Sequence, residues 1–167
     1  MLVHEKAIIL EYQFNTNNFD KLIFSWQDFL KHNIWQKLIA GIPPKKSGCG
    51  LIYELPNFLN RPNESFAIVD MRNIKFAEPH YHPTGETEIY FVLCGTARIF
   101  VGGIENKVKS GDVIIIEPNK AHFTIPDKDF VIAAVNTPPF KPASYISLTK
   151  TDHSVGFDLE KFNQIIS

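Results

Sequence analysis

The feature that most constrains the fold of this chain lies in residues 51–148. This region consists of short segments in which apolar residues recur with a period of two. They are rich in Ile, Val, Phe and Tyr, and turn pairs such as Cys94-Gly95 and Gly102-Gly103 separate them. Many short strands at this spacing are typical of a β-sandwich or barrel. The predicted strands are 51–55, 65–71, 74–77, 88–93, 97–101, 113–116, 121–125, 130–135 and 145–148. The sequence therefore predicts a mainly β domain.

A different period precedes this region. Phe19, Trp26, Trp35 and Leu38 belong to one apolar stripe with helical spacing, which a glycine and two prolines in 41–44 end. Such a stripe most often packs on a core, and contact between subunits is the alternative. We expect an N-terminal helical extension that packs on the barrel and contributes to a homodimer. The predicted organisation is an extension at 1–50, a barrel at 51–150 and a C-terminal tail at 151–167.

Size and charge exclude several classes of protein. A chain of 167 residues has room for one domain with a sizeable core. The net charge of −1 removes the usual electrostatic case for nucleic-acid binding, and no apolar run is long enough to span a membrane. Two cysteines, Cys49 and Cys94, cannot form a disulfide framework. With no secretory signal in the first residues, we expect a cytoplasmic protein with reduced thiols.

The stretch 79–95 contains the residues with the clearest chemistry. On an extended chain, residues two apart share a face, so His80 and His82 present both imidazoles to one side. A strand that starts near Glu88 can bring a carboxylate to the same space. Two imidazoles and a carboxylate suit a first-row divalent metal, and the facial form with open positions suits Fe(II). A His-x-His pair alone is often only a surface feature, so a second block has to support it.

That second block runs from Gly111 to His122: a turn, a buried strand, another turn and a histidine that opens the next strand. Together the two blocks resemble the paired motifs of the cupin superfamily. Glu88 and Gly95 have the family's spacing in the first motif, and Gly111 and His122 have it in the second. Two departures are a loop before Glu88 that is one residue longer than the commonest form and Asn119 in place of a turn glycine.

The resemblance implies a double-stranded β-helix, or jelly-roll barrel, in which the two motifs face each other. It further implies a divalent transition metal held by His80, His82, Glu88 and His122, with Fe, Mn, Zn and Ni all open. Glu86 is the alternative carboxylate ligand.

Two further residues are candidate substrate contacts inside such a barrel. Tyr90 has the phase of Glu88, and Thr124 has the phase of His122, so each side chain can point into the cavity. Ordinary packing is the alternative for both residues. We expect the rest of the cavity wall to be mainly Phe, Ile and Val, with few polar groups.

The cupin fold hosts enzymes, binding modules, storage proteins and regulators, so the fold does not determine the reaction. One hypothesis is a metal-dependent enzyme on a small oxygen-rich metabolite, of dioxygenase or sugar (or sugar-phosphate) isomerase type. A second is a module that binds or senses a small sugar or organic acid without turnover. A third is a protein whose metal only stabilises the barrel. All three leave the catalytic residues unassigned.

Overall fold

The computed structural model describes residues 34–55, 63–83 and 85–167. Residues 1–33 lie outside this range, and with them most of the predicted N-terminal helix, so the homodimer inferred from its stripe stays a prediction. The elements are α2 (Ile34–Leu38), β1 (Lys45–Ser47), β2 (Gly50–Glu54), β3 (Ser65–Asp70), β4 (His80–Tyr81), β5 (Thr87–Val101), β6 (Ile104–Lys109), β7 (Val113–Ile116), β8 (His122–Thr137), the 3-10 helix η2 (Pro142–Ser144), β9 (Ile146–Ser147) and α3 (Leu159–Ile166). The prediction of a mainly β domain is confirmed.

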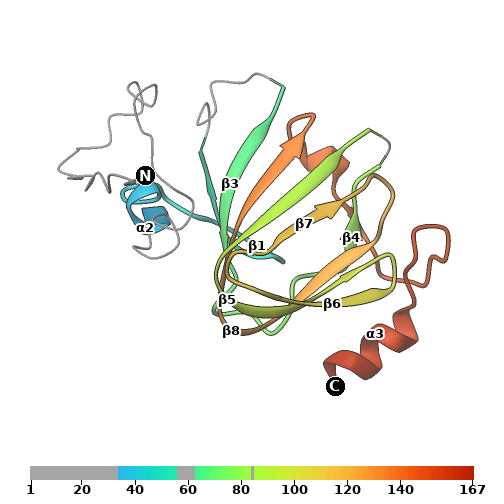
Figure 1. Cartoon of the computed structure of the whole chain (residues 1–167). Helices are drawn as coiled ribbons and strands as arrows, with labels where there is room; N and C mark the ends of the chain where they lie inside the picture. The colour runs from blue at the N-terminus through green and yellow to red at the C-terminus, as the bar shows by residue number, and fades with distance from the viewer. Residues whose placement is uncertain (1–33, 56–62, 84) are drawn as a thin grey trace, which may run out of the picture.

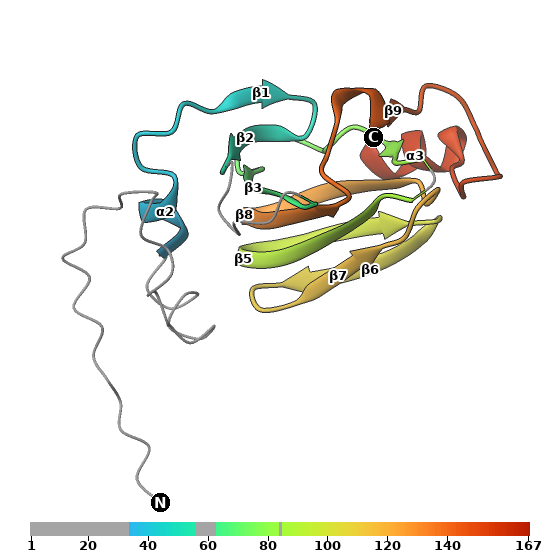
Figure 2. The same ribbon diagram turned by 90° about the horizontal axis from the view of Figure 1, so that it is seen from above.

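The strands of the described residues form one antiparallel sheet that curls into an open half-barrel (Figure 1). Its order is β1-β2-β3-β8-β4-β9, and β5 joins β8 while also pairing with β6 and β7. Figure 2 shows the β1–β2 hairpin on one side of β8 and the strands β5, β6 and β7 on the other. The two sides enclose the space into which the inward-facing side chains point.

The long pair β5 and β8 holds the half-barrel together. The sequence pattern predicted two short strands where the structure has β5, and two more where it has β8. Both predictions are wrong, because β5 and β8 are each one unbroken strand. The glycine at 95 bends β5 instead of ending it: the β5–β8 register shifts between Val92 and Ala97, and Gly95 has a φ of +78°. Such a β-bulge turns a strand while keeping it paired.

Other parts of the structure also differ from the prediction. Residues 74–77 are not a strand, because Ile74 N–H closes a turn on the Met71 carbonyl and Ala77 N–H makes a single bond to Thr124. Strands β1 and β6 were not predicted. Every residue of β1 and all but Val108 of β6 are exposed, so neither strand has the apolar alternation that would reveal it.

Apolar side chains pack on both faces of the curled sheet. Inside, Val92, Ile99 and Ile132 belong to the barrel core. On the outer face, Trp35 and Leu38 of α2 pack in one cluster with Leu93 and other sheet residues. A third cluster joins Phe162 of α3 to residues of β5 and β8. No helix within the described residues is long and apolar enough to cross a membrane.

We predict that Gly95→Ala destabilises the protein far more than Gly41→Ala. Both glycines have a positive φ, which costs a residue with a side chain of order 1 kcal/mol. A Cβ on Gly41 would meet nothing, whereas a Cβ on Gly95 would collide with the backbone of Lys128 and Asp129 on β8. Urea denaturation of both variants measures the difference, and equal losses would contradict a special role for the bend.

Candidate metal centre

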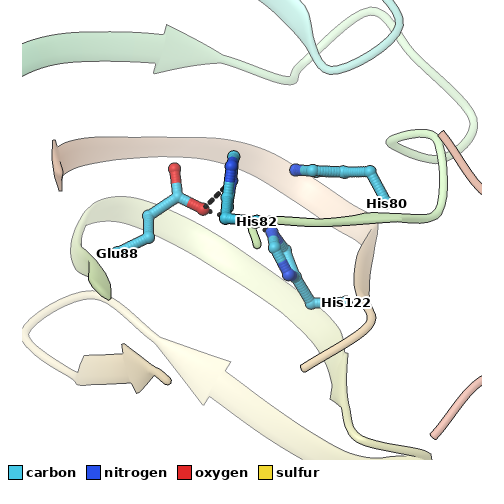
Figure 3. A group of neighbouring side chains, drawn as sticks. All are labelled: His80, His82, Glu88 and His122. Atoms are coloured by element: carbon cyan, nitrogen blue, oxygen red, sulfur yellow. Dashed lines mark hydrogen bonds and ion pairs between the residues drawn. The ribbon is translucent and has the colours of Figure 1, made fainter. Parts of the chain in front are cut away.

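Four buried side chains from three strands and one loop meet inside the half-barrel. His80 in β4 pairs directly opposite His122 at the start of β8, His82 follows β4, and Glu88 lies near the start of β5. One potential ligand atom of each residue lies within 4.8 Å of those of the other three. Figure 3 shows the Glu88 carboxylate pointing into the group of histidines and His80 reaching toward it from the opposite side.

Backbone carbonyls orient all three imidazole rings. The Nδ1 atoms of His80, His82 and His122 lie 2.8, 3.0 and 3.0 Å from the carbonyl oxygens of Glu78, Ser144 and Lys120. A carbonyl only accepts hydrogen bonds, so each Nδ1 carries the proton and donates it. In the neutral ring, Nε2 then has a free lone pair. A ligand histidine in a metalloprotein is fixed in this same way.

The Nε2 atoms converge on the carboxylate in an arrangement that suits a cation. Glu88 Oε2 lies 3.2 Å from Nε2 of His82 and 3.2 Å from Nε2 of His122. Nε2 of His122 is buried and has no hydrogen-bond partner. Acceptor atoms that face one another across a buried space need a proton or a metal ion between them. The donor set of three imidazoles and one carboxylate fits a first-row divalent metal.

The charge states of the four groups follow from their surroundings. Burial lowers the pKa of His80 well below its usual value, and the neighbouring His122 adds to this effect, so His80 is neutral. Burial also works against the charge on His82, but the hydrogen bond to Glu88 outweighs it and raises the pKa of His82. Burial alone would raise the pKa of Glu88, yet His122 and His82 hold it far below its usual range. Glu88 is therefore ionised throughout the physiological pH range.

The remaining candidate residues lie at different distances from this centre. Glu86 is not in the group of four: its Oε1 faces Nδ1 of His82, on the opposite side of the ring from Glu88. Tyr90 lines the cavity next to the centre, and burial followed by the charge of Glu88 raises the pKa of its hydroxyl. Thr124 is buried but does not line the cavity.

A cavity of about 790 Å³ opens onto the centre. His80, His82 and Glu88 line it, while His122 lies behind them. The apolar part of its wall contains Ile52, Val69 and Met71. The prediction of a wall with few polar groups is wrong, because the lining includes Lys45, Lys46, Ser47, Glu54, Glu64, Glu78 and Asn136. The lysines belong to β1, the strand that the sequence pattern did not reveal.

Tyr145 and Cys49 lie beside the centre, and no sequence pattern predicted either of them there. The Tyr145 ring stacks on His80 with centroids 4.1 Å apart, and its hydroxyl lies 3.7 Å from Cys49 Sγ. Burial raises the pKa of the Tyr145 hydroxyl well above its usual range. Burial likewise raises the pKa of Cys49 to about 11, although the Tyr145 contact works in the other direction. Both groups are thus neutral hydrogen-bond donors, and no spacing in the sequence links positions 49, 80 and 145.

Comparison with known proteins finds one family model and several solved structures that are similar to this chain. Residues 73–132 match the cupin domain model. No curated protein matches the chain. Among solved structures, a protein from Planctomyces limnophilus is 24% identical over 65% of this chain and 91% of its own, with a TM-score of 0.56. A predicted oxalate decarboxylase from Thermotoga maritima is 21% identical over 60% of this chain and 96% of its own (TM-score 0.53). Pac13, a nucleoside dehydratase from Streptomyces, is 12% identical over 70% and 92% (TM-score 0.55).

The raised pKa of Cys49 predicts how its thiol reacts. In metal-free protein, alkylation of Cys49 by iodoacetamide should rise by about tenfold per pH unit through pH 10, because only the thiolate reacts and its fraction is still growing there. Peptide mass spectrometry measures the rate. In Tyr145→Phe the rate at each pH should fall, since the contact that favours the thiolate is gone. A plateau near pH 9 would contradict the prediction.

Proposed function

We propose that this chain is a metal-dependent enzyme, because residues 73–132 match the cupin domain model and four buried candidate ligands meet at one point of the barrel. Its substrate is a small oxygen-rich metabolite, and the reaction is of dioxygenase or sugar-isomerase type. One observation carries the proposal: three carbonyl-oriented imidazoles and one ionised carboxylate converge beside an open cavity. A divalent metal bound there would act as a Lewis acid on a substrate oxygen.

The chain's own residues bind and orient the substrate. His80, His82, Glu88 and His122 would hold the ion, and the Tyr145 ring fixes the plane of His80 by stacking on it. The Tyr145 hydroxyl and the Cys49 thiol stay protonated, so they donate hydrogen bonds to oxygens of the substrate. Glu88 keeps its charge and can therefore act as an anionic ligand.

The composition of the cavity supports the substrate class. Lys46 lines the cavity and can attract an anion, whereas Lys45 pairs with Glu54 at 2.6 Å. The apolar side chains Ile52, Val69 and Met71 leave few groups that can orient a ligand on that wall. Two of the similar structures have names that refer to oxalate and to nucleosides, which are both small oxygen-rich molecules. A module that binds such a molecule without turnover is the competing proposal.

The metal content of purified variants tests the centre. Elemental analysis should find close to one divalent transition metal per chain in the wild type and at most a tenth of that in His82→Ala and His122→Ala, because each variant removes a ligand. His153→Ala is the matched control, since His153 is exposed and outside the cluster. If both ligand variants retain as much metal as the wild type, the centre is wrongly assigned.

Reconstitution tests the reaction. Metal-free protein is loaded anaerobically with Fe(II) or Mn(II) and incubated with pools of small sugars and organic acids, with and without O₂. We expect conversion only in a loaded form. Dependence on O₂ identifies a dioxygenase, and product of unchanged mass without O₂ identifies an isomerase. Equal conversion by metal-free protein would overturn the mechanism, and no conversion by any form would favour the binding module.

A further inference from the structure

Glu86 is a buried acid that the four-residue centre does not use. It lies just before β5 and is 5% exposed. Its Oε1 accepts a hydrogen bond of 3.0 Å from Nδ2 of Asn136, which is equally buried. The same oxygen lies 3.3 Å from Nδ1 of His82. Within the part of the chain that the structure describes, no lysine or arginine pairs with it.

The side chain of Glu86 faces N–H groups. Asn136 presents an amide N–H, which only donates, and Glu86 Oε1 accepts it. Nδ1 of His82 donates its proton to the Ser144 carbonyl, and Glu86 Oε1 lies at ion-pair distance from the same nitrogen. A buried carboxylate is costly unless such donors and a nearby positive charge compensate it.

Two carboxylates flank the imidazole of His82. Glu86 Oε1 lies 3.3 Å from Nδ1, and Glu88 Oε2 lies 3.2 Å from Nε2. A divalent ion bound at the centre would be attracted by both carboxylates, because charges are screened less in a buried site than in water.

We propose that Glu86 is a positioning residue of the metal centre: it confines the His82 ring from the Nδ1 side and places a second carboxylate close to a bound divalent ion. The proposal rests on the metal-binding function proposed above. Carboxylates that act through a ligand histidine commonly contribute 10–100-fold to metal affinity. Asn136 holds Glu86 in place from β8, the strand that also provides His122.

Substitution of Glu86 by glutamine isolates the charge. Competition with a chromophoric chelator measures the affinity of metal-free protein for Zn²⁺. Glu86→Gln keeps the size of the side chain and should bind Zn²⁺ about 10–100-fold more weakly than the wild type. Glu86→Asp keeps the charge and should recover at least half of the loss on a logarithmic scale. In Co²⁺-loaded protein, the visible absorption bands of Glu86→Gln should shift, since the field at His82 changes.

The control is Glu105→Gln. Glu105 is exposed in β6 and belongs neither to the cavity lining nor to the group of four. Its loss should change Zn²⁺ affinity by less than about twofold, because an exposed charge away from the centre is screened. Circular dichroism of the metal-free variants establishes that each is folded.

The outcomes separate this inference from the proposed function. If Glu86→Gln binds Zn²⁺ as tightly as the wild type while His82→Ala does not bind it, the role of Glu86 is wrong and the centre stands. If Glu86→Asp is as weak as Glu86→Gln, the charge argument is overturned. If Glu86→Gln does not fold, Glu86→Asp decides. Unchanged Zn²⁺ affinity and an unchanged cobalt spectrum in Glu86→Asp would support the role of the charge. A loss of Zn²⁺ affinity as large as that of His82→Ala would overturn it. Absence of Zn²⁺ binding in the wild type would overturn the metal centre itself.

Discussion

The curvature of the β5–β8 pair is the constraint on which the candidate centre depends. His122 pairs with Val101 at the far end of β5, and Glu88 pairs with Asn136 near the other end. On a flat ladder these two positions would lie roughly 40 Å apart. In the structure, Glu88 Oε2 is 3.2 Å from Nε2 of His122. The bend at the register shifts around Gly95 folds the ladder so that its two ends face each other across the half-barrel.

A second constraint comes from the backbone around the three histidines. Each ring donates its Nδ1 proton to a carbonyl that is near in sequence for His80 and His122 and distant for His82. The rings are therefore oriented before any ion binds, and little conformational freedom is lost on binding. The orientation also determines the chemistry, because it leaves only Nε2 lone pairs and the Glu88 oxygens to face the interior.

The wall of the cavity is assembled from segments far apart in the chain. Cys49 comes from the turn of the β1–β2 hairpin, and Tyr145 directly follows η2. Their side chains meet, with the thiol sulfur 3.7 Å from the hydroxyl oxygen. Beside them, the stacking of Tyr145 on His80 joins the wall to the centre. The two buried glutamates beside His82 are likewise placed by the fold. Glu86 and Glu88 are two residues apart in sequence, yet they lie at opposite nitrogens of the His82 imidazole.

The sequence by itself determined what local periodicity and motif spacing can encode. The period of two predicted the β class, the His-x-His pair predicted two imidazoles on one face, and the two motif blocks predicted the family. Only the tertiary structure decided the features that depend on long-range pairing. These are the continuity of β5 through Gly95, the strand β1 with no apolar alternation, the meeting of Cys49 and Tyr145, and the place of Glu86 behind His82. The physical reason is that alternation reports which face of one strand is buried, whereas the partners of a buried polar group are set by how distant strands pair and curl.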